Sequence, residues 1–470
     1  MSTHKPHPPK TPVAPLHDGE LAHTLERRHV VMISIGGIIG AGLFVGSSAA
    51  IQEAGPAVLF SYILAGLLIF FIMRMLGELV IEKPEVGSFL NHIRRGVSHH
   101  VAFVLGWSYW LFWISAIAAE AIAGSKILYD YLPIPPIIMG PLLVLSMMAT
   151  NLFSVKGYGE FEFWFALIKI ITISIFIIFG LSALFHLFGY KAGKVSNLWE
   201  YNGFVPNGFI AVFAVIPTIL FTVTGSEVAT IAAAESDKPA ENVAYACKTI
   251  IVRVVLFYIA SIGVILCIVP WQKIVPGASP FLDALNTIGV PGSSTIMAFT
   301  ILVAVLSCLN SSIYATSRTL FELAEYDDAP HWLVHTNHRG VPQMAIITAS
   351  AIGIALSLIS TISPTVFFSY LLSCAGSVVL AVYIMIAYAQ IRVRTEMERK
   401  NQKPIFKMWL FPYLSWFTIA CFVAVIIAML VNAESRKQIL LSALTIVILA
   451  ICRFVMCLRN NGRTEEKAIE

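Results

Sequence analysis

Apolar runs long enough to cross a membrane recur along nearly the whole chain. A spanning helix needs about 20 mostly apolar residues, and twelve such runs are present. They cover residues 29–48, 57–80, 101–129, 135–153, 161–187, 209–234, 249–270, 295–325, 344–361, 364–390, 408–431 and 438–458. Only 12% of the residues are charged, whereas soluble domains have roughly 25%. The sequence therefore predicts an all-α integral membrane protein with twelve transmembrane helices.

The basic residues indicate how these helices are oriented. If the N-terminus is cytoplasmic, 24 of the 31 Lys and Arg residues fall in cytoplasmic tails, loops and helix ends, and five fall in outer loops. Because cytoplasmic loops are enriched in Lys and Arg, we expect a multi-pass protein with both termini inside. Residues 1–28 are predicted to be a disordered cytoplasmic tail, 29–458 the membrane domain, and 459–470 a second cytoplasmic tail.

Two of the predicted helices are interrupted in comparable ways. The run VVMISIGGIIGAGLFVG at 30–46 holds five glycines, each of which weakens a helix by about 1 kcal/mol relative to alanine. In IPTILFTVTGSEVATIAAAES at 216–236, Pro217 removes a backbone donor and Gly225 loosens the chain. Each break lies in the first helix of a block of five spans. Because five is an odd number, the second block has the opposite orientation in the membrane to the first. Paired interruptions of this kind indicate a transporter's binding site.

The broken helices predict a site for a small solute that carries both charges. Backbone groups cannot stay unpaired in lipid, so an unwound stretch must line a cavity or bind something. Gly40 and Gly42 allow close approach to the backbone, and the amides of a half-helix that begins near Gly42 suit a carboxylate. Freed carbonyls at 221–225 suit an ammonium group. The predicted substrate-binding residues here are Gly40, Ala41, Gly42, Thr222, Thr224 and Gly225.

The glycines have a second interpretation. Gly36 and Gly40, and likewise Gly42 and Gly46, have the small-xxx-small spacing that brings membrane helices close together. Spacing alone does not separate packing from binding, and the matching break in the sixth span is the observation that favours binding.

Three ionisable residues lie deep within predicted spans. A charge at mid-bilayer costs about 2.5–3.5 kcal/mol on insertion scales, so such residues need a role. Desolvation disfavours the charged amine of Lys169, which makes Lys169 a candidate for proton coupling; the alternative is a structural pair with a carboxylate. Glu227 is expected to face the substrate amine or to orient a helix end. Glu120 either takes part in proton coupling and substrate contact or pairs with a polar group in the scaffold.

The run SCLNSSIYATSRTLFELAE at 307–325 supplies further polar groups. Asn310 and Tyr314 are four residues apart, so they lie on one face of a helix. They are candidates for substrate binding, and the alternative is that they form bonds between helices.

Motifs for catalysis or cofactor binding are absent from the sequence. It has no GxxxxGK[ST], HExxH or GxSxG motif, and the seven cysteines form no CxxC pair. We therefore expect no catalytic residues, no metal site, no cofactor and no nucleic-acid partner, and the chain is not predicted to be an enzyme.

Several long motifs, in the same order, resemble the bacterial amino acid permease branch of the amino acid/polyamine/organocation superfamily. They are RRHVVMISIGGIIGAGLFVGSS, AGPAVLFSYILAGLLIFFIMRMLGEL, VKGYGEFEFWFALIKI, TGSEVATIAAAES and SCLNSSIYATSRTLFELA, and the resemblance covers roughly residues 25–455. Within the branch, WLFWISAIAAEAIAG, NGFVPNGF and IAAAESDKP are most similar to members that carry 4-aminobutyrate. The segment IPTILFTVTGSE departs from the Phe-Ser-Phe-Met-Gly-type sequence usual there, at the expected pocket.

The resemblance implies a specific architecture and mechanism. It implies a leucine-transporter-like fold with a five-plus-five inverted repeat (29–187 and 209–390), discontinuous helices 1 and 6, and two C-terminal helices (408–458). It also implies that the Gly40-Ala41-Gly42 segment holds the substrate carboxylate, that residues Thr224 to Glu227 hold the amine, and that Lys169 couples transport to protons. The implied location is the bacterial inner membrane.

We therefore expect a proton-coupled symporter that imports an amino acid by alternating access, with 4-aminobutyrate or a related omega or neutral amino acid as substrate. The alternatives are a permease of the same family for aromatic, neutral or basic amino acids, and an amino acid exchanger. The expected partners are the amino acid, protons and the lipid bilayer, and the chain is expected to act as a monomer or weak homodimer.

Overall fold

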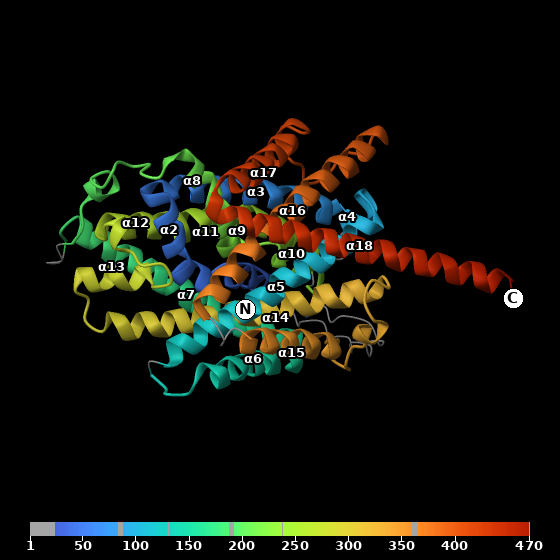
Figure 1. Ribbon diagram of the computed structural model, residues 1–470, viewed down its shortest axis with the longest axis horizontal. Coiled ribbons are helices and arrows are strands. Elements are labelled where there is room, and N and C mark those ends of the chain that lie inside the picture. Colours follow the sequence, from blue (N-terminus) through green and yellow to red (C-terminus); the bar gives the residue numbers. More distant parts are fainter. Residues whose placement is uncertain are drawn as a thin grey trace, which may run out of the picture.

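The computed structural model describes residues 24–82, 88–129, 131–187, 192–236, 238–359 and 364–469. This part of the chain is almost entirely helical (Figure 1). Its only strand-like feature is a single parallel bridge between Leu25 and Ser236. The predicted tail at 1–28 lies mostly outside the described residues, and α18 continues through the predicted tail at 459–470 as far as Ile469.

The first half of the chain forms nine helical elements with short connections. They are α1 (Arg27–Gly36), the π-helix η1 (Gly42–Gly46), α2 (Ser47–Ala54), the 3-10 turn η2 (Gly55–Ala57), α3 (Val58–Glu82), α4 (Phe89–Gly96), α5 (His99–Tyr129), α6 (Pro136–Phe153) and α7 (Val155–Leu184), all within the described ranges.

The second half begins with the 3-10 turn η4 (Val195–Leu198) and ends with the two outermost helices. Its longer elements are α8 (Gly208–Ala214), α9 (Ile216–Val223), α10 (Val228–Ala234), α11 (Pro239–Val254), the π-helix η5 (Val255–Ala260), α12 (Ser261–Ile268), α13 (Pro280–Ile288), α14 (Ser293–Glu325), α15 (Gln343–Ile359), α16 (Pro364–Arg399), α17 (Tyr413–Val431) and α18 (Ala433–Ile469).

The helices agree with the predicted spans in position but not all in length. In the described part of the chain, eight helical segments are long and apolar enough to cross a membrane. Three shorter apolar helices, Gly208–Leu220, Val255–Ile268 and Gln343–Ile359, fall within three further predicted spans. The predicted first span is divided between α1 and η1–α2, because the chain leaves the helix after Gly36. Twelve crossings and the inverted repeat stay predictions.

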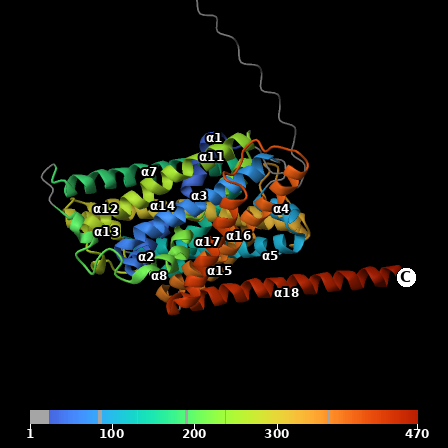
Figure 2. The ribbon, with the colours of Figure 1, turned by 90° about the horizontal axis from the view of Figure 1, so that it is seen from above.

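The two interrupted segments lie in the interior of the helix bundle. The long helices α5 and α14 pack against each other more extensively than any other pair, and α1 packs against α7, α10 and α14. In the views of Figures 1 and 2, α18 extends beyond the rest of the molecule toward the C-terminus. The interrupted segments are therefore surrounded by protein.

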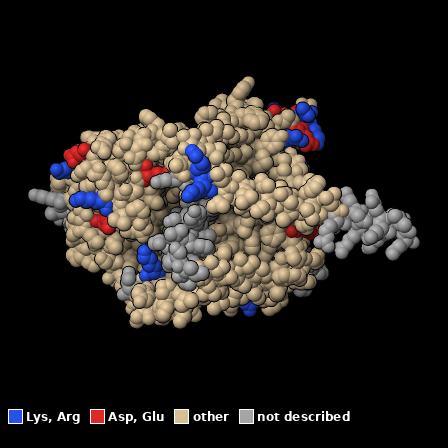
Figure 3. Space-filling view, in the orientation of Figure 1, with Lys and Arg blue, Asp and Glu red and all other residues tan. Residues whose placement is uncertain are grey.

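The outer surface is largely uncharged, as Figure 3 shows for one face. Large apolar side chains are exposed on several helices, including Trp164, Ile178, Phe299 and Phe454. Exposed apolar surface of this extent marks an interaction with a membrane or a partner rather than with water.

A pair of glycines sets the contact between the two breaks. Gly225 has φ +125°, a conformation that side chains rarely adopt, and a Cβ on it would lie 2.6 Å from the carbonyl carbon and oxygen of Gly37. Thr224, which ends α9, is extended, with ψ 146°. Only a residue without a side chain allows the backbones of the two breaks to come this close.

Candidate functional site

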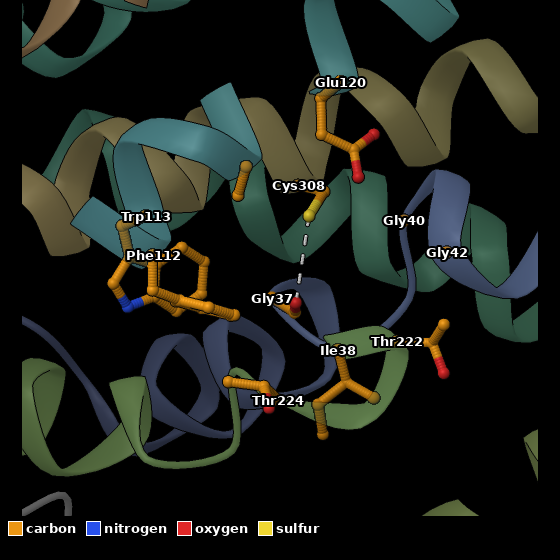
Figure 4. Close-up of a pocket in the computed structure, with 11 residues that line it drawn as sticks. Gly37, Ile38, Gly40, Gly42, Phe112, Trp113, Glu120, Thr222, Thr224 and Cys308 are labelled. Carbon is orange, nitrogen blue, oxygen red and sulfur yellow. Dashed lines mark hydrogen bonds between the residues drawn. The ribbon is translucent and has the colours of Figure 1, made fainter. Parts of the chain in front are cut away.

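A small cavity lies where the two breaks meet α5 and α14 (Figure 4). The first break and η1 contribute Gly37, Ile38, Gly40 and Gly42, and the end of α9 contributes Thr222 and Thr224. The long helix α5 contributes Phe112, Trp113, Ala116 and Glu120, and α14 contributes Cys308. The cavity thus combines bare backbone, two hydroxyls, two aromatic rings and one carboxylate.

The amide at the start of the second half-helix holds a carboxylate. Both oxygens of Glu120 lie 3.2 Å from the backbone nitrogen of Ala41, the residue before η1. The Glu120 side chain is buried. A helix N-terminus has unpaired N–H groups and a positive dipole end, so it favours an anion. The structure therefore shows that this backbone position can bind a carboxylate group.

Glycine is required on both sides of this contact. A Cβ at Gly40 would lie 2.6 Å from Glu120 Oε1 and 2.7 Å from the Cβ of Cys308. A Cβ at Gly42 would lie 2.9 Å from Thr222 Cγ2 and 3.0 Å from Thr222 Cα. Neither position has room for a side chain without displacement of its neighbours.

Lys169 stabilises the backbone of the first break. Its side chain is fully buried, and Nζ donates three hydrogen bonds of 2.8 Å, to the carbonyls of Gly36 and Ile39 and to Ser307 Oγ. An ammonium group has three donors, so these acceptors use all of them. The two carbonyls are groups that the break in the helix has left free, which is the physical reason for a cation at this depth.

Tyr258 links the two breaks on their other side. Its hydroxyl lies 2.8 Å from the carbonyl oxygen of Ile38 and also contacts that of Thr222. Tyr258 belongs to the π-helix η5, and its side chain is buried. The Gly37 carbonyl, in contrast, faces the cavity, where Cys308 Sγ lies 3.9 Å from its oxygen (Figure 4).

Glu227 lies behind the cavity rather than on its wall. Its carboxylate accepts hydrogen bonds of 3.2 Å from the hydroxyls of Tyr109 and Tyr383 and from the backbone N–H of Gly225. The Thr224 hydroxyl lies 3.3 Å from the same Tyr383 hydroxyl. These contacts fix the conformation of the second break, and the role of Glu227 in transport stays a prediction.

Asn310 and Tyr314 make contacts between helices and do not line the cavity. The Asn310 side chain contacts Thr150 Oγ1 at 2.7 Å and Asn151 Nδ2 at 2.8 Å, both on α6. The Tyr314 ring stacks on Tyr158 of α7, with centroids 4.3 Å apart. They lie near each other on α14, and Asn310 bonds to α6 whereas the Tyr314 ring stacks on α7.

Sequence reasoning missed several residues of this region. Phe112, Trp113 and Cys308 line the cavity, and Glu162 is a buried carboxylate that contacts Ser307. Glu162 precedes Lys169 by seven residues, a spacing that places both on the same side of a helix. That spacing was the signal that could have identified it. Among the described residues, no three or more His, Cys, Asp and Glu side chains are grouped as a metal site requires.

Comparison with known proteins assigns the chain to a family. The family model for amino acid permeases matches residues 29–468. The chain belongs to the amino acid permease family. This permease is 41% identical to a probable GABA permease of Pseudomonas aeruginosa, over 96% of its own chain and 95% of the relative. It is 39% identical to the gamma-aminobutyric acid permease of Bacillus subtilis, over 95% and 96%. An aromatic amino acid transport protein of Escherichia coli is 34% identical, over 93% and 95%.

Family membership confirms the resemblance to the amino acid/polyamine/organocation superfamily. The protein is an all-helical membrane transporter for an amino acid, and it is a permease rather than an enzyme.

Proposed function

We propose that this permease imports 4-aminobutyrate, or a related omega or neutral amino acid, together with protons across the bacterial inner membrane by alternating access. The observation that carries the proposal is the contact between the Glu120 carboxylate and the Ala41 amide. A position that binds the carboxylate of a side chain suits the carboxylate of a substrate equally well. The substrate carboxylate replaces Glu120 there, between Gly40 and Gly42.

The other end of the substrate lies toward the second break. The Gly37 carbonyl faces the cavity, and Thr222 and Thr224 line it. Carbonyl and hydroxyl oxygens accept hydrogen bonds from an ammonium group, while Gly225 and Glu227 hold the backbone of the second break in place. The methylene groups of an omega-amino acid pack between Phe112, Trp113 and Ile38. The names of the two relatives that share about 40% identity support 4-aminobutyrate.

Lys169 supplies the proton coupling in this proposal. It joins α7 to the carbonyls of Gly36 and Ile39, so loss of its proton weakens the hold on the first break. The ammonium group that carries the proton is then bonded directly to the backbone segment that binds the substrate. Both termini are cytoplasmic, and the twelve helices form the five-plus-five inverted repeat.

Uptake by the purified protein in proteoliposomes tests the proposal. Labelled 4-aminobutyrate should accumulate when an inward proton gradient is imposed, and the accumulation should collapse when a protonophore is added. Uptake that does not depend on the proton gradient and requires amino acid inside the vesicles would instead identify an exchanger. Competition by unlabelled neutral, aromatic and basic amino acids, measured in the same vesicles, identifies the substrate class.

A further inference from the structure

Glu162 is a second buried charged group on the helix that carries Lys169. Both side chains are fully buried, and both belong to α7. Seven residues separate them, about 10 Å along the axis of a helix that rises 1.5 Å per residue. A buried carboxylate is costly unless it is paired and hydrogen-bonded, so its position needs an explanation that the binding site does not provide.

One hydroxyl connects the two charges. Ser307 of α14 accepts a hydrogen bond of 2.8 Å from Lys169 Nζ, and its own hydroxyl proton points to Glu162 Oε1. A serine hydroxyl has a single donor and two acceptor lone pairs. With Lys169 donating, the only proton Ser307 has is directed to Glu162. The hydrogen bonds therefore run in one direction, from the ammonium through the hydroxyl to the carboxylate.

The surrounding elements leave room for this carboxylate and bond to it. A Cβ on Gly36 of α1 would lie 1.6 Å from Glu162 Oε1, so the absence of a side chain there makes space for the carboxylate. Asn310, three residues after Ser307 on α14, donates to Glu162 Oε2 at 3.3 Å. Both carboxylate oxygens are thus hydrogen-bonded to α14.

Few other titratable groups face the pair. Electrostatic contact with Lys169 comes from Glu162 on α7, Cys308 on α14 and Glu120 on α5. Tyr158, one turn before Glu162 on α7, is the tyrosine next to it, and its hydroxyl lies 3.3 Å from Ser311 Oγ. Lys169 is the cation in electrostatic contact with Glu162, and Glu162 is in turn the strongest carboxylate contact of Lys169, so the two groups are counter-charges.

Polar groups continue from Glu162 toward the start of α7. Asn310 contacts Thr150 and Asn151 at the C-terminal end of α6, and Tyr158 stacks on Tyr314, which lies beneath the guanidinium of Arg318. Arg318 pairs with Glu235 at 2.9 Å. In the proposed orientation this is the cytoplasmic half of the bundle, so Glu162 lies between Lys169 and the cytoplasm.

We propose that Glu162 takes the proton of Lys169 through the Ser307 hydroxyl and delivers it to the cytoplasmic side. Lys169 gives one proton to Ser307 Oγ while the Ser307 hydroxyl proton moves to Glu162 Oε1. The ammonium becomes a neutral amine, the carboxylate becomes a carboxylic acid, and the hydroxyl is regenerated. The summed charge of the Lys169 and Glu162 side chains is zero before and after the transfer. Glu162 then loses its proton when the cytoplasmic side opens, and Lys169 is reprotonated from outside.

This inference rests on the proposed proton-coupled transport and assigns its route. The neutral amine keeps its two remaining N–H groups for the carbonyls of Gly36 and Ile39, but hydrogen bonds from a neutral amine are weaker than those from an ammonium. Proton transfer to Glu162 therefore loosens the first break at the moment when the substrate must leave.

The test uses the full chain in proteoliposomes and compares two measurements. Exchange of labelled for unlabelled amino acid without a gradient reports binding and reorientation, and gradient-driven accumulation reports proton coupling. Glu162→Gln keeps the shape and removes the proton acceptor. Ser307→Ala removes the connecting hydroxyl, and Ser307→Thr retains it. Glu160→Gln, two residues away on the same helix at its partly exposed end, is the matched control.

We expect Glu162→Gln and Ser307→Ala to exchange at nearly the wild-type rate while accumulation falls by about 100-fold, the scale of a lost acid–base group. Ser307→Thr and Glu160→Gln should accumulate normally. Wild-type accumulation in Glu162→Gln overturns the proposal, and so does equal loss of exchange and accumulation, because it would place Glu162 in binding or folding. If the wild-type protein itself shows no gradient-driven accumulation, the proposed function fails rather than the route.

Discussion

Gly225 lies against the peptide group of Gly37, so that the breaks in two helices nearly 190 residues apart share one backbone contact. A Cβ on Gly225 would be 2.6 Å from the carbonyl of Gly37, a distance that no real contact permits. This contact determines how closely the two half-helices approach each other, and with them the groups that line the cavity.

Gly225→Ala is therefore expected to abolish transport and to destabilise the protein. The φ of +125° costs an alanine on the order of 1–3 kcal/mol, in addition to the steric clash. Thermal unfolding in detergent and uptake by the same preparation measure the two effects. Gly263→Ala is the control, because its added Cβ would meet only Leu59 Cδ2 at 3.9 Å. Wild-type transport by Gly225→Ala would show that the breaks do not need this contact.

Gly42→Val should block substrate binding. The Cβ would already lie 2.9 Å from Thr222 Cγ2, and the two further methyl groups would extend into the approach to the backbone. Equilibrium binding of labelled amino acid to the purified variant is the measurement, with Gly263→Ala again as the control. Normal affinity in Gly42→Val would place the ligand elsewhere in the protein.

Glu120→Gln should bind the substrate more tightly than the wild-type protein. Glu120 holds the Ala41 amide that the substrate carboxylate needs, and a neutral amide oxygen is a weaker competitor than a carboxylate. Hydrogen bonds to charged groups exceed neutral ones by about 1 kcal/mol, which corresponds to roughly a fivefold lower Kd. A higher Kd in this variant would mean that Glu120 contacts the substrate amine instead.

Lys169→Ala should abolish concentrative uptake at every pH tested. The substitution leaves the carbonyls of Gly36 and Ile39 without their donor, at a cost of about 1–3 kcal/mol for each buried group left unsatisfied. Uptake driven by a proton gradient, measured across a range of external pH, is the test, with Lys126→Ala on α5 as a lysine control. Accumulation with the wild-type pH dependence would contradict the coupling role.

The sequence was sufficient to locate the breaks and to predict that Lys169 is buried. Glycine and proline weaken a helix at the position where they occur. This effect can be read from the sequence without knowing which helices pack against the segment. The partner of Glu120 was not predictable in the same way, because it is a backbone amide 79 residues earlier in the chain. Almost every residue has a backbone N–H, so the residue type does not show which of them a distant carboxylate will contact.

Glu162 was missed for a different reason. The predicted fifth span begins at residue 161, which placed Glu162 at the membrane edge, whereas α7 begins at Val155 and buries it. The contacts of Tyr314 show what helical spacing alone does not predict. Helical spacing places Tyr314 and Asn310 near each other on α14, but it does not say which neighbouring helix each will meet.

An experimental structure with a bound amino acid tests the central claim most directly, namely that the two breaks bind the opposite ends of one substrate. We predict that the substrate carboxylate lies on the Ala41 amide with Glu120 displaced, and that its ammonium faces the Gly37 carbonyl and Thr224. A ligand bound elsewhere, or a substrate in this cavity with Glu120 still on the Ala41 amide, would contradict the account.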